Sequence, residues 1–241
     1  MKKHIILLSA LVLFAVSSCS KFAGDIITQD FGTAGSYTAI EAENAFDVIV
    51  NDAVSTISVI AGEHMMPKTV VEVVDNTLKI RIKGLLTNYD AAPKVIIPYN
   101  ADLRKVSLSG ACDFHSDHAL TGTKVEVDLS GASGFHANIE ADEAEVKVSG
   151  ASDATIEGQV NKLKINLSGG SRIVKGVAGN KYALKCNECE GTMTGASKAW
   201  IDCDGTIKVT LSGASELHYT GDAASGNCSC TGGSKVVRDV L

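Results

Sequence analysis

Cysteines are the residues of this sequence with the widest choice of chemistry, and there are seven of them. Cys186 and Cys189 have the two-residue spacing of redox motifs and zinc sites, but no second such pair follows at zinc-finger spacing. Cys186 and Cys203 lie eight and nine residues before successive copies of a repeated phrase, described below. The sequence therefore favours structural cysteines over a redox or zinc centre, with Cys186–Cys203 as a candidate disulfide in an oxidising compartment.

Two histidines are the strongest candidate metal ligands. His115 and His136 both lie six residues after the start of a copy of the phrase, and Asp113 and His118 are near them in sequence. Imidazoles on neighbouring strands can bind a metal ion. His218 occupies the same position of a later copy, but the remaining copies carry unlike side chains there: Thr155, Val174, Trp200 and Val237. That mixture is typical of an exposed strand, so we expect no metal or other cofactor and keep His115 and His136 as weak candidates.

Acidic side chains are the candidates for acid–base catalysis. Four of them fall on outward strand positions: Glu126, Asp128, Glu145 and Glu190. They form no obvious acid–base pair, and the sequence has no nucleophile motif, phosphate-binding loop or His-Glu-x-x-His motif. We predict a non-enzyme without catalytic residues. A polysaccharide-processing enzyme is the alternative.

These side chains are positioned by a phrase, Ser/Thr-Gly-Ala/Gly-Ser/Cys, that occurs seven times at intervals of 18 to 26 residues. Its copies begin at Ser109, Ser130, Ser149, Ser168, Thr194, Ser212 and Thr231. Mostly apolar residues lie one and three positions before each copy and five after it, with mainly polar residues between. Alternation with period two predicts strands with one buried face, and the glycine predicts a corner between them.

One copy is too short to bury its own apolar face, so copies must stack on one another. Successive copies run in the same direction, which predicts an all-β fold, a parallel β-solenoid resembling a right-handed β-helix. A hairpin-built sandwich or propeller is the alternative, but propeller blades need about 40 residues each. We expect residues 106–241 to form this solenoid and residues 37–105 to form an irregular β capping region. The two together, 37–241, would be one continuous domain, and a separate small β domain at 37–105 is the alternative.

The first residues read as a bacterial lipoprotein signal peptide. Lys2 and Lys3 precede an apolar run, and Val16-Ser17-Ser18-Cys19 follows it. We expect cleavage after residue 18, a lipid on Cys19 that anchors the chain to a membrane, and a tether over residues 19–36. The alternative is an ordinary signal peptide with an incidental cysteine. The expected location is the cell envelope, as an outer-membrane lipoprotein with its leaflet undetermined.

The net charge and two remaining segments limit which partners the chain can bind. Removing Lys2 and Lys3 from the 22 basic side chains leaves 20 against 28 acidic ones, which disfavours nucleic acid. Residues 176–182 are an insertion in the longest interval and predict a loop able to carry binding. The last phrase is followed closely by residues 236–241, so we also expect an unpaired C-terminal edge able to self-associate.

The lipoprotein signal, the irregular β start and the serial Val-x-Leu-Ser-Gly-Ala-Ser units together resemble the putative auto-transporter adhesin family with the head GIN domain, common in Bacteroidetes. The resemblance covers about residues 37–241, although the tripeptide Gly-Ile-Asn itself does not occur. It implies an exported β-helical protein with an adhesive function. We therefore expect a lipid-anchored, non-catalytic adhesin or surface-binding module for a glycan or protein ligand. A structural, self-associating envelope protein is a further alternative.

Overall fold

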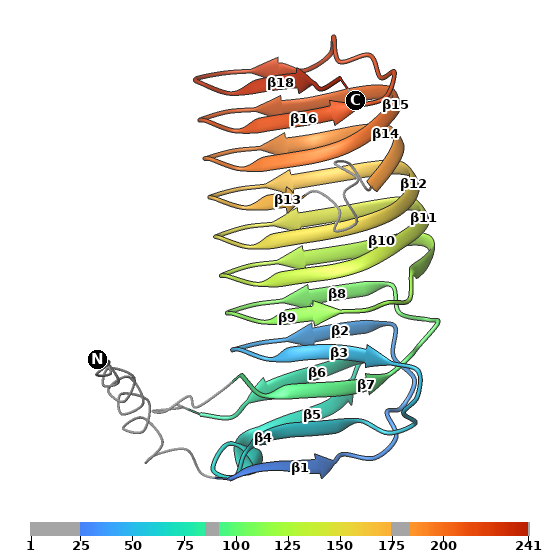
Figure 1. Cartoon of the computed structure of the whole chain (residues 1–241), viewed down its shortest axis with the longest axis vertical. Helices are drawn as coiled ribbons and strands as arrows, with labels where there is room; N and C mark the ends of the chain where they lie inside the picture. The colour runs from blue at the N-terminus through green and yellow to red at the C-terminus, as the bar shows by residue number, and fades with distance from the viewer. Residues whose placement is uncertain (1–24, 85–91, 175–183, 241) are drawn as a thin grey trace, which may run out of the picture.

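The computed structural model describes residues 25–84, 92–174 and 184–240. Strands make up all the regular structure of these residues except one 3-10 turn, η1 (Met66–Lys68), so the fold is all-β, as predicted (Figure 1). In the described part of the chain no helix is long or apolar enough to span a membrane. Cys19 and the predicted loop at 176–182 lie outside the described residues.

The repeated phrases separate strands that stack in parallel. These strands are β8 (Lys105–Leu108), β9 (Asp113–His115), β10 (Leu120–Leu129), β11 (Gly134–Val148), β12 (Asp153–Leu167), β13 (Arg172–Val174), β14 (Leu184–Met193), β15 (Lys198–Leu211), β16 (Glu216–Thr220), β17 (Ser229–Cys230) and β18 (Lys235–Arg238). Equivalent residues of successive copies pair directly, as Val127 does with Val146 and Val146 with Ile165. Figure 1 shows the resulting layers, one above the other along the long axis.

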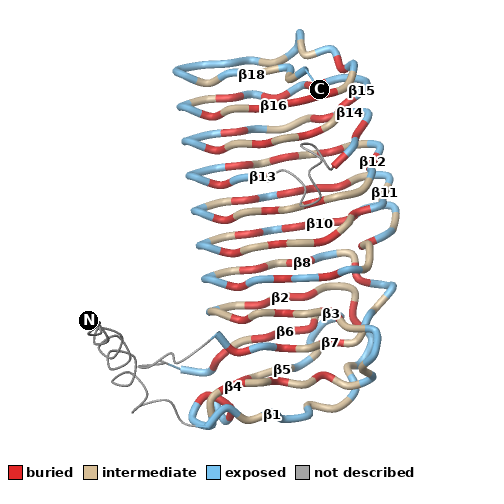
Figure 2. The backbone as a smooth tube through the Cα atoms, in the orientation of Figure 1, coloured by how far each residue is buried: buried red, intermediate tan, exposed pale blue. Residues whose placement is uncertain are grey.

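The core is a set of apolar columns that run through these layers (Figure 2). Every predicted inward position from β8 to β16 is buried except Gly191, which is half-buried. The last layer differs from the prediction, because Cys230 is exposed and Cys228 is half-buried. Within the described residues no strand covers β17 from beyond, so these inward positions are left open.

The phrases predicted as corners lie one above another and form a continuous hydrogen-bonded column. The amide of Ala132 donates to the Gly110 carbonyl at 2.7 Å, and that of Ala151 donates to the Gly131 carbonyl at 2.8 Å. Gly131 has φ +80° and Gly150 has φ +74°, a backbone conformation that costs glycine little. The same donation continues to Gly233, whose amide bonds the Gly213 carbonyl at 2.8 Å.

The region before the first phrase joins the same ladders in an order that the sequence did not indicate. Its strands are β1 (Ile26–Asp30), β2 (Ala39–Ala42), β3 (Asp47–Asn51), β4 (Ser58–Gly62), β5 (Thr69–Val74), β6 (Thr77–Ile82) and β7 (Lys94–Pro98). Strand β2 pairs in parallel with both β6 and β8, and β3 pairs in parallel with both β7 and β9. The later strands β6 and β7 therefore lie beneath the earlier β2 and β3.

Antiparallel strands complete this end of the molecule. Strand β5 pairs with β6, β4 pairs with β7, and β1 pairs with β4. Strand β1 falls within residues 19–36, so part of the segment predicted as a tether is a paired strand.

Candidate functional site

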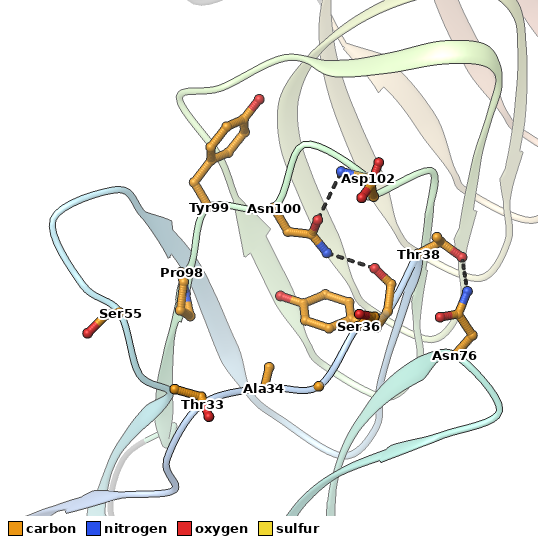
Figure 3. Close-up of a pocket in the computed structure, with 12 residues that line it drawn as sticks. Thr33, Ala34, Ser36, Thr38, Ser55, Asn76, Pro98, Tyr99, Asn100 and Asp102 are labelled. Atoms are coloured by element: carbon orange, nitrogen blue, oxygen red, sulfur yellow. Dashed lines mark hydrogen bonds between the residues drawn. The ribbon is translucent and has the colours of Figure 1, made fainter.

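A polar pocket opens beside the N-terminal strands, where four separate chain segments meet (Figure 3). Its volume is about 380 Å³. The lining residues are Thr33, Ala34, Gly35, Ser36, Tyr37, Thr38, Ser55, Asn76, Pro98, Tyr99, Asn100 and Asp102. They come from the segment before β2, the β3–β4 loop, the β5–β6 turn and the end of β7 with the loop after it.

One wall is held by the β5–β6 turn. Asp75 and Asn76 adopt φ +49° and +62°, a left-handed conformation that asparagine and aspartate accept more readily than most residues. The turn places the Asn76 side-chain amide to donate to Thr38 Oγ1 at 2.8 Å, while the Thr38 amide donates to the Asn76 carbonyl at 3.0 Å. This pair of bonds fixes the turn against the start of β2.

Asn100 holds the opposite wall. Its Nδ2 donates to the Tyr37 carbonyl at 2.7 Å, and its Oδ1 accepts from the Asp102 amide at 2.9 Å. The Tyr37 side chain is buried, and burial raises the pKa of its phenol, which therefore stays neutral. The loop after β7 is thus tied to the segment that precedes β2.

The pocket lining has two aromatic residues, Tyr37 and Tyr99; Tyr37 is buried, whereas Tyr99 is 42% exposed. Its ring lies against the His118 ring with centroids 4.3 Å apart, and His118 Nε2 lies 3.4 Å from an Asp52 carboxylate oxygen. An exposed tyrosine offers a ring face and a hydroxyl to a ligand. With the surrounding hydroxyls and amides, the site can bind a polar molecule through hydrogen bonds and ring stacking.

The two histidines predicted as weak metal candidates do lie together. The rings of His115 and His136 stack with centroids 4.8 Å apart and an interplanar angle of 18°. They line a shallow depression together with Asp47, Asp113 and Asp153. Burial is the larger cause that raises the pKa of Asp113, and the negative charge of Asp47 is the second. His118 is not among its lining residues. Within the described part of the chain, no three His, Cys, Asp or Glu residues are placed to hold a metal ion.

Cys186 and Cys203 are direct register partners on β14 and β15, and both are buried free thiols. The hydrogen bond with Cys203, followed by burial, raises the pKa of Cys186, while the same bond lowers that of Cys203. Cys189 is also buried, and burial raises its pKa well above the ordinary value. The pair is placed side by side, as the spacing predicted, and the disulfide stays a prediction.

Three of the four outward acids, Glu126, Glu145 and Glu190, contact lysines. Glu145 Oε2 accepts from Lys124 Nζ at 2.8 Å, and Glu145 Oε1 lies 3.1 Å from Lys147 Nζ. The hydrogen bonds from Lys124 and Lys147 lower the pKa of Glu145 to about 2. Lysine contacts also lower the pKa of Glu126 and Glu190.

The pocket was not predicted from the sequence. Its lining is spread over residues 33–102, outside the repeats that the sequence analysis followed. The available signal was the short run Pro98-Tyr99-Asn100 after a clear strand, because turn-forming and aromatic residues at a strand end often mark a binding loop.

Comparison with known proteins decides the family. The model of the "putative auto-transporter adhesin, head GIN domain" family matches residues 36–223. The chain belongs to this family. Among curated proteins, none matches the sequence.

Solved structures with a similar fold come from species of Bacteroides and Parabacteroides. A putative adhesin of Bacteroides fragilis has a TM-score of 0.73 and 19% identity, over 89% of this chain and 95% of that one. A putative adhesin of Parabacteroides merdae has a TM-score of 0.61 and 20% identity, over 90% and 97%. A Parabacteroides distasonis protein described as a putative lipid binding protein has a TM-score of 0.61 and 17% identity, over 90% and 98%. At these identities the likeness concerns the fold alone.

Proposed function

We propose that this head GIN-domain protein is a non-catalytic adhesin or surface-binding module of the bacterial cell envelope, anchored by a lipid on Cys19. The family match over residues 36–223 carries the proposal. The outer membrane is the proposed site of attachment, since the segment before Cys19 has the order of parts of a lipoprotein signal.

The scaffold that we propose for this function is a β-solenoid of the right-handed β-helix type. Parallel in-register pairing from β6 through β2 and β8 to β17, and the hydrogen-bonded corner column, support it. Residues 37–105 would form its capping end and 106–241 its repeats. Such a scaffold holds loops rigidly at one side, which suits a binding protein.

The outward glutamates give little support to the alternative, a polysaccharide-processing enzyme. A general acid must carry a proton near the working pH. The lysine contacts lower the pKa of Glu126, Glu145 and Glu190, so these carboxyls stay ionised at neutral pH. Release of reducing ends from a polysaccharide by the purified protein, abolished by one outward Glu→Gln change, would overturn the non-catalytic assignment.

Anchoring and adhesion can be tested on cells. We expect the native chain in the membrane fraction and Cys19→Ala in the soluble fraction. Deletion of the gene should reduce binding of cells to mucin or to cells of the same community, and the native chain should restore it. Protease treatment of intact cells then distinguishes a surface location from a periplasmic one. Unchanged adhesion in the deletion strain would refute the adhesin assignment.

Self-association through the C-terminal edge is a separate proposal. Among the described strands β18 pairs with β16 alone, which leaves its other backbone edge available for pairing. The amides of Lys235 and Asp239 donate toward β16, so by alternation the amide of Arg238 faces the open edge. Sedimentation should detect dimers of the native chain, and Arg238→Pro, which removes this donor, should weaken them more than Arg238→Ala does.

A further inference from the structure

We propose that the pocket lined by Tyr99, Asn100, Asp102, Ser36, Ser55 and Asn76 binds a neutral saccharide, with the Tyr99 ring as its stacking platform. This inference rests on the proposed adhesive function and names the ligand class of that function. Nothing in the family match assigns a ligand or a site, and the geometry of these residues carries the inference.

The lining has the chemistry of a site for an uncharged, hydroxyl-rich molecule. Side-chain hydroxyls, two amides and one carboxylate supply both donors and acceptors, and none of the lining residues is Lys, Arg or His. Ser36 and Ser55 are exposed, and within the described residues their hydroxyls make no hydrogen bond. These groups are available to the hydroxyls of a sugar.

Tyr99 adds the apolar surface that a sugar ring requires. The C–H face of a pyranose is apolar, and an exposed aromatic ring covers such a face while its hydroxyl remains in water. The contact with His118, with ring centroids 4.3 Å apart, restrains the tyrosine, and Asp52 in turn contacts His118 at 3.4 Å. The ring therefore keeps its position while the residue stays 42% exposed.

The pocket is also formed before any ligand arrives. Asn100 bridges the Tyr37 carbonyl and the Asp102 amide, and Asn76 bonds Thr38. Arg104 Nη1 donates to the Ala101 carbonyl at 2.6 Å and braces the loop from outside the pocket. Fixed walls reduce the entropy lost on binding, and a volume of about 380 Å³ lies in the range of about 300 to 1,000 Å³ usual for small-molecule sites.

Other ligand classes fit less well. The only formal charge on the lining is the Asp102 carboxylate, whose side chain is 81% exposed and lies 3.8 Å from Arg104 Nη2, so the lining itself offers no cation to phosphates, sulfates or acidic sugars. An acyl chain needs a largely apolar lining, whereas the side chains here that carry no polar atom are only those of Ala34 and Pro98. A neutral glycan matches both the charge and the polarity.

The test uses the full mature chain and tetrasaccharides derived from glucan, mannan and galactan, titrated by calorimetry. We expect at least one of them to bind. Tyr99→Ala should weaken that binding about tenfold, which corresponds to about 1.4 kcal/mol, because it removes the ring face on which the sugar stacks. Tyr99→Phe should retain most of the affinity because it keeps the ring. Trp200→Ala is the matched control, since this half-buried aromatic lies on β15, far from the pocket in sequence, and it should leave the affinity unchanged.

A second variant guards against a folding defect in Tyr99→Ala. Ser55→Trp fills the pocket from an exposed loop position without removing any contact, and it should abolish binding while the far-ultraviolet circular dichroism spectrum stays native. Saccharide binding that survives both Tyr99→Ala and Ser55→Trp would place the site elsewhere and overturn the inference.

The remaining outcomes separate this inference from the proposed function. Binding to phosphatidylglycerol vesicles or to acidic sugars, but not to neutral ones, would overturn the saccharide assignment. Adhesion of cells that is lost on gene deletion but restored by the Tyr99→Ala and Ser55→Trp chains would leave the adhesin standing and refute the pocket. No adhesion phenotype and no saccharide binding would refute both.

Discussion

At the residue scale, the corner glycines carry the most demanding requirement of the fold. Each has a positive φ, and its backbone lies directly against the carbonyl of the corner beneath it. A Cβ on Gly150 would collide with the Gly131 carbonyl oxygen, and one on Gly131 would collide with that of Gly110. The column therefore excludes side chains both by backbone conformation and by space.

The first prediction follows from this contact. Gly150→Ala should lower the denaturant midpoint and destabilise the protein by about 1–3 kcal/mol, because alanine must adopt a strained φ and displace the neighbouring layer. Gly226→Ala is the control, since no other group lies within 4 Å of the place that its Cβ would occupy, and it should change the midpoint little. Equal midpoints for Gly150→Ala and the wild-type chain, measured in urea, would contradict the close stacking.

The same column shows which corner positions could be predicted from the sequence and which could not. Asn44 has φ +80° and occupies the corner beneath Gly110, whose neighbour Ala111 donates to the Asn44 carbonyl at 2.7 Å. The glycine pattern missed this corner because asparagine replaces glycine there, although asparagine also tolerates the left-handed region. The inward columns were predictable because successive side chains of a strand point to opposite faces. The alternation of apolar and polar residues therefore identifies the buried face whichever apolar residue stands at each position.

Cysteine reactivity gives the second prediction. In the folded, reduced protein, Cys230 should react with iodoacetamide within minutes, because it is exposed. Cys186 and Cys189 should resist it, because they are buried and their pKa values are raised. Mass spectrometry of peptides from briefly alkylated protein measures this order, and denatured protein, in which all of them react, is the control.

The predicted disulfide has its own measurement. In protein exported to an oxidising compartment and digested without reduction, we expect a Cys186–Cys203 linked peptide, since the two residues are register partners on adjacent strands. Recovery of both cysteines as free thiols from such protein would show that their contact is packing alone.

At the scale of elements, outward side chains of opposite charge join neighbouring strands. Lys124 on β10 contacts Glu145 on β11 at 2.8 Å, and Lys164 on β12 lies 3.8 Å from the same carboxylate. The Glu145 side chain is only 11% exposed, so its charge is less screened than those of its partners. One partly buried carboxylate thus links three strands.

This contact predicts a pH-dependent stability. Glu145 has a pKa of about 2 in the folded protein against an ordinary value of 4.5, so its contribution is present above about pH 4.5 and is lost as the pH falls toward 2. Glu145→Gln should cost about 1–2 kcal/mol at pH 7, with a difference that narrows below pH 4.5. Urea denaturation at several pH values measures it. Glu140→Gln, an exposed site on the same strand, should be neutral throughout, and a deficit for Glu145→Gln that is independent of pH would contradict the argument.

The strands before the first repeat could be predicted from the sequence, but their spatial order could not. The strands of residues 37–105 were predictable from alternating apolar residues such as Val48, Val59, Ile80 and Val95, all of which are buried. Their spatial order β6–β2–β8 was not, because period two fixes which face of a strand is buried and says nothing of which strand lies beside it. The pocket exists only because this return of the chain brings residues 33–38, 76 and 98–102 together, so it could not be predicted either.

At the scale of the molecule, a stack in which each layer contacts only its neighbours has a stability that varies along its length. Strands β11 and β12 have partners on both sides and place Val146 and Ile165 in the core at 0% exposure. Strand β18 pairs on one side only, and its inward Val236 is half-buried. At the other end, antiparallel β1 and β5 cover the ladders, so the two ends are not equivalent.

Amide hydrogen exchange should therefore show a gradient rather than uniform protection. We expect the slowest exchange in β11 and β12 and the fastest in β17 and β18, because opening the C-terminal layer breaks one interface while opening a central layer breaks two. Cys112→Ala, which leaves a cavity at a fully buried corner position, should accelerate exchange in β8 and β9 and leave β15 and β16 unchanged. Equal acceleration in every strand would mean that the stack opens as one cooperative unit, and the pocket at its N-terminal end would then share the stability of the whole chain.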